Sequence, residues 1–163
     1  MNKIAVLVFA SALVFTGCLK KDEGCPYPAT SIVAPASEEQ QVKEYLTANN
    51  IEAVKHSSNL YYQIVEPGTG KTPELCSQIR VNYVGKLTNG NTFDSNPNAV
   101  FVLGSLIEGW KKGLPLIKSG GRIRLYIPPS LGYGNNDIKD QGNNVIIPGK
   151  SILIFDITLS QVE

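Results

Sequence analysis

The chain of 163 residues carries almost no net charge, because 15 lysines and arginines stand against 14 aspartates and glutamates. A protein that binds nucleic acid through its phosphates needs a basic excess, so we expect no nucleic-acid partner. Histidine is nearly absent too. The single one, His56, has no cysteine or acidic cluster at metal-ligand spacing, and no Gly-x-Ser-x-Gly sequence occurs. Metal sites, catalytic histidines and serine nucleophiles therefore lack their parts, and we expect neither metal nor cofactor.

No apolar run reaches the roughly 20 residues that a membrane-spanning helix needs. The run from Ile4 to Phe15 follows Lys3 and is broken by a single serine, which is typical of an export signal. Residues 14–18, Val-Phe-Thr-Gly-Cys, resemble the lipobox of bacterial lipoproteins. This resemblance implies cleavage after residue 17 and acylation of Cys18. An ordinary secretory leader and an uncleaved anchor are the alternatives.

Lipidation would place the protein in the cell envelope, anchored by lipid in the outer membrane and either periplasmic or surface-exposed. Residues 20–23, Lys-Lys-Asp-Glu, resemble a short charged tag that sends some bacterial lipoproteins to the cell surface. Two cysteines remain after acylation, Cys25 and Cys76. Disulfides persist outside the cytosol, but the sequence leaves open whether these two pair or stay separate thiols.

The first regular element is expected at Ser37. This residue can act as an N-cap, with Gln40 three residues on, and Asn49 can end the helix after about Ala48. Apolar residues at positions 42, 45 and 46 form a stripe that can pack on the domain or pair with a second copy, so a monomer and a dimer through this helix both stay open. The expected segments are 1–17, signal peptide; 18–36, tether with three prolines; 37–59, N-terminal helix and linker; and 60–163, one folded domain.

After this helix the apolar period changes to two, as in strands. Asn89-Gly90 is a hairpin turn signal, and residues 106–117 can hold only a short helix before Pro115. Several antiparallel strands with one short helix against them make an α+β fold. The expected strands are 60–65, 78–87, 100–103, 122–127 and 151–159.

The stretch 81–95 contains Tyr-x-Gly-x-Leu, a glycine turn and then Phe-Asp-Ser. It resembles the FK506-binding-protein (FKBP) type of peptidyl-prolyl cis-trans isomerase, and the likeness continues in register over about residues 60–159. The resemblance implies an antiparallel sheet of about five to six strands curved around a short helix. It also implies isomerisation of X-Pro bonds in client polypeptides, and a pocket that FK506-like macrolides can enter. Further matching blocks are Phe101-Val102-Leu103-Gly104, Leu106-Ile107-Glu108-Gly109-Trp110, Gly121-Arg122, Ile127-Pro128, Tyr133-Gly134, Ile146-Ile147-Pro148 and Leu153-Ile154-Phe155-Asp156.

The resemblance also implies a site. Its catalytic residues would be Asp94, facing the carbonyl carbon of the twisted bond, and Tyr133, donating its hydroxyl to a substrate carbonyl. Trp110 would form the floor beneath the proline ring. Taken singly, the aromatic residues are as typical of a core, and Asp94 of a turn cap. The implied substrate-binding residues are Tyr83, Phe93, Leu106, Ile107, Trp110, Ile146, Ile147 and Phe155.

Three features depart from the family pattern. Ala99 stands where many members carry an aromatic residue, which predicts a thinner pocket wall. Residues 135–144 form a longer and more polar loop, and Glu108, often basic, is expected to point to solvent. The sequence thus favours an isomerase that assists folding of extracytoplasmic proteins. A non-enzymatic chaperone or assembly factor with the same fold is the alternative, and a structural envelope lipoprotein is a third.

Overall fold

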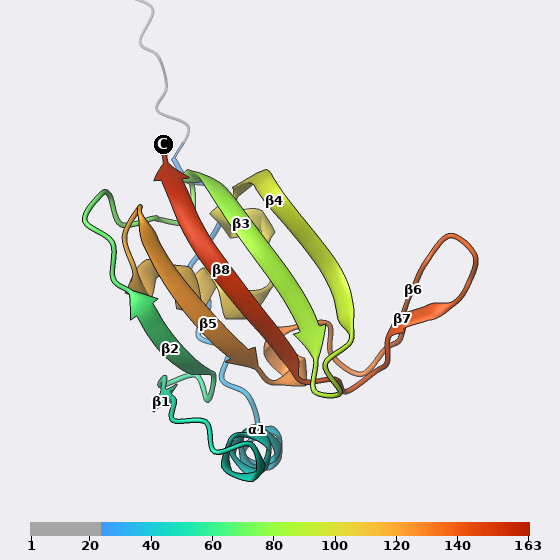
Figure 1. Ribbon diagram of the computed structural model, residues 1–163. Coiled ribbons are helices and arrows are strands. Elements are labelled where there is room, and N and C mark those ends of the chain that lie inside the picture. Colours follow the sequence, from blue (N-terminus) through green and yellow to red (C-terminus); the bar gives the residue numbers. More distant parts are fainter. Residues whose placement is uncertain (1–23) are drawn as a thin grey trace, which may run out of the picture.

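A computed structural model describes residues 24–163, in which six antiparallel strands form the main sheet (Figure 1). The strand order is β1-β2-β5-β8-β3-β4, and β6 and β7 form a separate hairpin. This is the expected α+β fold. The expected signal peptide, Cys18 and the charged tag at 20–23 lie outside the described residues. The elements are α1 Ala36–Ala48, β1 Val54–Lys55, β2 Tyr61–Glu66, β3 Gln78–Leu87, β4 Thr92–Val102, the short 3-10 turn η1 Leu103–Ser105, α2 Glu108–Gly113, the turn η2 Leu114–Leu116, β5 Gly121–Ile127, the turn η3 Pro129–Leu131, β6 Ile138–Lys139, β7 Val145–Ile147 and β8 Leu153–Val162.

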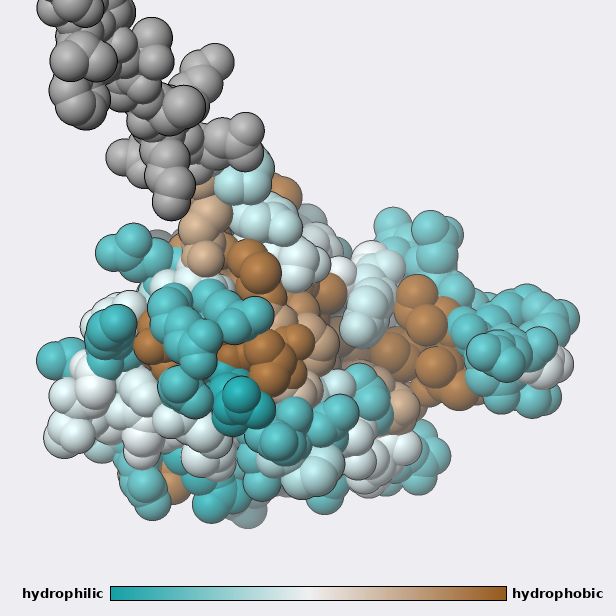
Figure 2. Space-filling model, turned by 90° about the horizontal axis from the view of Figure 1, so that it is seen from above, coloured by the Kyte–Doolittle hydropathy of each residue, from teal (hydrophilic) through white to brown (hydrophobic). Residues whose placement is uncertain are grey.

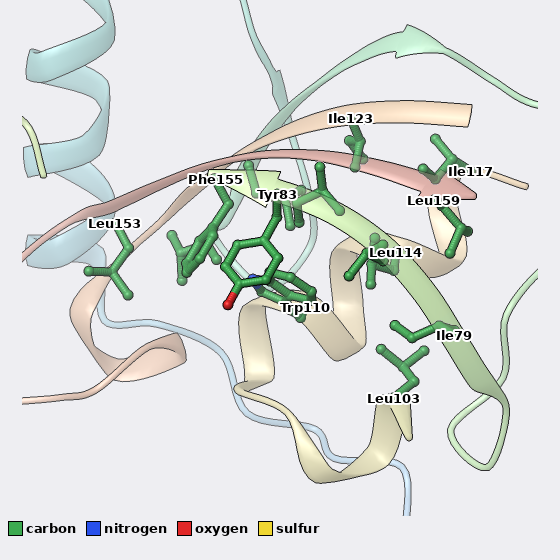
Figure 3. Close-up of a cluster of buried hydrophobic side chains, with 14 of the residues drawn as sticks. Ile79, Tyr83, Leu103, Trp110, Leu114, Ile117, Ile123, Leu153, Phe155 and Leu159 are labelled. Carbon is green, nitrogen blue, oxygen red and sulfur yellow. The ribbon is translucent and has the colours of Figure 1, made fainter. Parts of the chain in front are cut away.

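The main core lies between the inner face of the sheet and α2 (Figure 3). In β8, alternate residues from Leu153 to Leu159 are at most 4% exposed, as the period of two predicts. They meet Trp110 of α2 and Leu114 directly after it. Full burial of each such side chain contributes about 1.5–3 kcal/mol, so the fixed position of α2 follows from this face of the sheet.

Four of the five expected strands appear as β2, β3, β5 and β8, with bounds within three residues of those expected. The fifth, 100–103, proves to be only the end of β4, which begins at Thr92. The first part of β4 consists mostly of polar residues and so gives no strand pattern in the sequence. The register of β4 against β3 also shifts twice. Pro97 lies in one of these shifts, where a missing N–H costs little. An edge strand with bulges does not need the apolar alternation on which the prediction relied.

The predicted N-cap at Ser37 is wrong, because α1 begins one residue earlier and Ser37 lies inside it. Pro35 precedes the helix, and its carbonyl accepts hydrogen bonds from the N–H groups of Glu38 and Glu39, both at 3.0 Å. The proline ring fixes φ, here −56°, at a helix-compatible value. The predicted end is confirmed, since Ala48 is the last helical residue and Asn49 caps it.

The apolar stripe of α1 packs on the outer face of the sheet, at one end. Val42 and Leu46 are buried against Tyr61 of β2 and Tyr126 of β5. The Tyr61 hydroxyl also donates a 2.6 Å hydrogen bond to Glu39. Of the two uses left open for the stripe, the structure shows packing on the chain's own domain.

Further along the same outer face, Asp156 of β8 accepts hydrogen bonds from Arg122 at 2.7 and 2.9 Å and from Arg124 at 2.7 Å. Burial raises the pKa of Asp156, but the two guanidinium groups outweigh burial and hold the pKa below its usual value. The carboxylate is therefore ionised at neutral pH and neutralises part of an otherwise basic face.

Residues 25–34 contain no helix or strand, yet they are attached to the domain rather than forming the expected free tether. Cys25 and Cys76 form a disulfide, which decides the alternative that the sequence left open. Ala34 is 2% exposed, within the main core. The expectation for Glu108 is also wrong. Its carboxylate accepts a hydrogen bond from Thr30 and pairs with Lys111 at 2.9 Å, because the attached segment covers it.

Candidate active site

A pocket of about 230 Å³ opens at one end of the main core. It brings together residues from β3, β4, the segment 106–110, the loop after β5, and β8. Seven of the ten residues predicted for the site line it, together with Phe101, which was not predicted. The lining residues are Tyr83, Asp94, Phe101, Leu106, Ile107, Trp110, Tyr133 and Phe155.

The indole ring of Trp110 forms the floor of the pocket, and neighbouring aromatic rings pack edge-on against it (Figure 3). Its ring centroid lies 5.2 Å from that of Tyr83, at 84°, and 5.2 Å from that of Phe155, at 88°. Phe101 lies at 6.3 Å and 86°. Edge-to-face pairs add about 0.5–1.5 kcal/mol each to the free energy of burial, so the indole is held rigidly. A rigid apolar floor suits a small apolar ring such as that of proline.

The one polar atom of this floor has no hydrogen-bond partner among the described residues. It is the indole Nε1 of Trp110, which is fully buried. Leaving a buried donor unpaired costs about 1–3 kcal/mol, and such groups are rare in protein interiors. The unpaired indole N–H therefore lowers the stability of the fold, while the ring that carries it forms the apolar floor of the pocket.

Asp94 lies at the pocket rim, where its carboxylate accepts a 2.6 Å hydrogen bond from the Tyr83 hydroxyl. Burial raises the pKa of Tyr83, and the bond to Asp94 and its charge raise it further. The phenol therefore stays protonated and keeps donating. The pair fixes the orientation of an exposed carboxylate beside an aromatic cavity.

Tyr133 lies just after the turn η3 and reaches the pocket from the loop that follows β5. It is 39% exposed, and burial of the remainder, followed by the charge of Asp94, raises the pKa of its hydroxyl. Gly134 beside it has φ +70°, a conformation that L side chains rarely adopt, and its N–H donates to the carbonyl of Pro129 at 2.8 Å. The turn thus presents a protonated hydroxyl to the pocket.

Three predicted residues do not line the pocket. Phe93 lies in the second register shift of β4, and its ring contacts that of Phe155 edge-on at 5.4 Å, so it supports a wall from behind. Ile147 is 3% exposed and belongs to the main core, where it pairs with Ile138. Ile146, its neighbour, points the other way and is 39% exposed. The alternation of a strand explains why only one of the two isoleucines is available to a ligand.

Phe101 is the lining residue that sequence reasoning missed as a site residue. A signal existed, because Phe101 stands two residues after Ala99 and so shares its face of β4. Ala99 is buried and does not line the pocket. Phe101 contacts both Tyr83, at 6.3 Å, and Trp110.

The expected long loop at 135–144 is largely a projecting hairpin made of β6 and β7 (Figure 1). Its tip is polar, whereas hydrophobic residues gather where it joins the body (Figure 2). Val145 and Ile146 are 47% and 39% exposed. The hairpin therefore adds exposed apolar surface outside the pocket.

Among the larger hollows, one of about 360 Å³ lies along the polar side of α1, and two more offer no comparable chemistry. One, of about 560 Å³, lies on the outer face around Asp156, and its arginines are already bonded to that carboxylate. The other, of about 630 Å³, lies between residues 25–30 and 72–76. Over residues 24–163 no cluster of three or more His, Cys, Asp or Glu side chains is arranged to hold a metal ion. No helix within this range is long and apolar enough to cross a membrane.

Comparison with known families agrees with this geometry. Residues 70–160 match the family described as FKBP-type peptidyl-prolyl cis-trans isomerase. A probable FKBP-type peptidyl-prolyl cis-trans isomerase of Haemophilus influenzae is 38% identical over 139 residues, which cover 83% of this chain and 56% of the relative. The peptidyl-prolyl cis-trans isomerase Mip of Coxiella burnetii is 37% identical over 76% of this chain and 54% of its own length. The chain thus spans about half the length of these curated relatives.

Two solved structures show the same fold. The crystal structure of FkpA from Escherichia coli has a TM-score of 0.67 and 37% identity, covering 78% of this chain and 60% of its own. The crystal structure of AtFKBP13 has a TM-score of 0.63 and 32% identity, covering 69% of this chain and 99% of its own. The curved sheet with a short helix against it is the fold that these structures share.

Proposed function

This chain belongs to the FKBP-type peptidyl-prolyl cis-trans isomerase family, and from that premise we propose that it catalyses isomerisation of X-Pro bonds in polypeptides outside the cytosol. The observation that carries the proposal is the aromatic pocket around Trp110, with the Asp94 carboxylate and the Tyr133 hydroxyl at its opening. The pocket holds no nucleophile and needs none, because no bond is made or broken.

The barrier to be lowered is rotation about a partly double C–N bond, about 18–20 kcal/mol for a peptide. Water stabilises the charge-separated resonance form that gives this bond its double character. An apolar pocket that excludes water disfavours that form and binds the twisted imide more tightly than either planar isomer. Each tenfold gain in rate needs about 1.4 kcal/mol of such preference.

The residues divide this work among themselves. Trp110 supports the proline ring, and Phe155 and Ile107 exclude water from its sides. Tyr133 donates a hydrogen bond to a substrate carbonyl and holds the peptide across the opening. Asp94, oriented by Tyr83, places a carboxylate beside the carbon of the twisting carbonyl. These roles are proposals supported by the lining of the pocket and by the 2.6 Å bond between Tyr83 and Asp94.

The full chain, purified in mild detergent, is expected to accelerate isomerisation of an X-Pro tetrapeptide and refolding of a proline-limited protein, reactions that take tens of seconds unaided. The measurement is the rate at increasing enzyme concentration, with FK506 as competitor, since we propose that FK506-like macrolides enter the same pocket. Binding of proline peptides with both rates left at the uncatalysed value would contradict the isomerase and favour the chaperone alternative. The exposed Val145 and Ile146 are the surface that such a chaperone would use.

We also propose that the protein is lipid-anchored in the cell envelope through Cys18. Replacing Cys18 by alanine is expected to abolish acylation, because the cysteine sulfur is the site of lipid attachment. Labelling with a fatty-acid probe and detergent partitioning measure this result. Ser31→Ala is the control, since it changes an exposed residue outside the lipobox and leaves the Cys25–Cys76 disulfide intact. Equal labelling of wild type and Cys18→Ala would rule out the anchor.

The apolar stripe of α1 is buried against this chain's own sheet, which favours a monomer over a dimer formed through this helix. Val42 and Leu46 are 0% and 5% exposed without any partner chain. The opposite side of α1 carries Gln40, Lys43, Glu44 and Thr47, which offer little apolar area to a second copy.

A further inference from the structure

The segment of residues 25–34, here termed the strap, is fixed to the domain at both ends. At one end Cys25 forms the disulfide with Cys76. At the other, the N–H of Ala34 donates to the carbonyl of Ser58 at 3.0 Å, and the Asn59 amide donates to the carbonyl of Ala34 at 2.7 Å. In Figure 3 its pale blue trace passes along the side of α2 that faces away from the sheet.

The first contact of the strap with the pocket segment is made by Tyr27. A Cβ atom built on Gly104 would lie 2.2 Å from Cγ of Tyr27 and 2.5 Å from its Cβ. The tyrosine therefore rests directly on the glycine backbone, and no other residue type fits at position 104. Gly104 stands two residues before Leu106, the first pocket residue of this segment.

The second contact is made by Thr30. Its hydroxyl donates to the carboxylate of Glu108, the first residue of α2. Lys112, one turn later, donates to the Thr30 carbonyl at 2.9 Å. Side chains of Glu108 and Lys112 are only 16% and 12% exposed, so these charged contacts are largely shielded from water. Glu108 and Lys112, which both bond to Thr30, stand on either side of Trp110 in the sequence.

α2, the helix that Thr30 contacts, is too short to keep a fixed position without tertiary contacts. α2 has six residues, and no side chain caps the free N–H groups of its first turn. Helices of this length are unstable alone, so tertiary contacts determine where α2 lies. On the sheet side, the absence of side chains at Gly109 and Gly113 lets α2 approach Ile127 and Leu125 closely. On the other side, Glu108 and Lys112 form hydrogen bonds with the strap.

We propose that Thr30 is a positioning residue for the isomerase pocket. Through Glu108 and Lys112 it holds the segment that carries Leu106, Ile107 and Trp110. No strap residue lines the pocket, so Thr30 acts through α2 and not on the substrate. This inference rests on the proposed isomerase function and adds to it the residues that set the position of the pocket floor.

Thr30→Val tests the inference, because valine keeps the shape of threonine and removes the hydroxyl. We expect kcat/KM for an X-Pro tetrapeptide to fall about fivefold, the effect of part of one hydrogen bond to a charged group. The protein has a single tryptophan, Trp110, so its fluorescence reports on the pocket floor directly. We expect a changed emission spectrum in the folded variant, and we expect Thr30→Ser to restore both readouts.

Thr47→Val is the matched control. It removes a hydroxyl that bonds the Lys43 carbonyl on the exposed side of α1, and it should leave rate and emission unchanged. If Thr30→Val lowers only the unfolding midpoint, with wild-type kcat/KM and wild-type emission, Thr30 is merely structural and the inference fails. A wild-type protein without isomerase activity would instead overturn the proposed function, while the emission of Thr30→Val would still show whether the strap positions Trp110.

Discussion

Asp94→Ala is expected to lower kcat/KM for an X-Pro tetrapeptide about ten- to hundredfold, the range for losing one hydrogen-bonded charged group. The variant removes the carboxylate at the pocket rim and frees the Tyr83 hydroxyl that now donates to it at 2.6 Å. Asp94 is exposed and belongs to an edge strand, so no buried charge partner is left behind. Circular dichroism should therefore show an unchanged fold.

Two further variants divide the role of Asp94 into charge and orientation. Asp94→Asn keeps the shape and an acceptor for Tyr83, so a loss as large as that of Asp94→Ala would assign the effect to the negative charge. Tyr83→Phe keeps the charge and removes the 2.6 Å bond that orients it.

Tyr133→Phe, which removes one neutral hydrogen bond, should lower kcat/KM only about three- to tenfold. Full activity in both Asp94→Ala and Tyr133→Phe would show that the catalytic residues lie elsewhere.

Removing the disulfide with Cys25→Ser and Cys76→Ser is expected to give the largest loss of stability, up to about 4 kcal/mol on the chain-entropy treatment. The two cysteines are 51 residues apart in sequence, so the cross-link removes much freedom from the unfolded chain. Urea unfolding of the wild type and of the double variant, both without reductant, measures the difference in free energy.

The matched comparison is the wild type with a reductant present, which should unfold at the midpoint of the double variant. Mass spectrometry of the purified protein without reductant checks the bond itself. Two free thiols there, or equal unfolding midpoints with and without reductant, would contradict the disulfide. The strap should lose one of its two fixed ends in the double variant, so emission of Trp110 is expected to move in the same direction as in Thr30→Val.

How far the sequence could predict the fold depended on whether burial repeats along the chain. In β3 and β8 every second side chain enters the core, and the predicted bounds are close to those observed. In β4 only Ala99 is buried, and polar residues with a proline make up its first part. Local pattern rules identify a strand through a continuous apolar face, and an edge strand with bulges does not have one.

The site divides in a similar way. The order of short motifs, such as Phe93-Asp94, Trp110 and Tyr133-Gly134, was enough to assign the family and seven of the pocket's residues. The same motifs gave no means to separate Ile146 from Ile147. Which of two neighbours enters a core depends on strand register, and in β7 register is fixed by pairing with Ile138 of β6.

The sequence by itself determined the class of fold, the core positions of its regular strands and the family, because these depend on local periodicity and on residue identities in order. Only the tertiary structure decided the pairing of Cys25 with Cys76, the packing of the α1 stripe on the domain and the contacts of Thr30 with Glu108 and Lys112. Each of these joins residues that are far apart along the chain, up to 82 positions in the hydrogen bond between Thr30 and Lys112. Such contacts leave no periodic signal, since it is the closure of the sheet that brings the partners together.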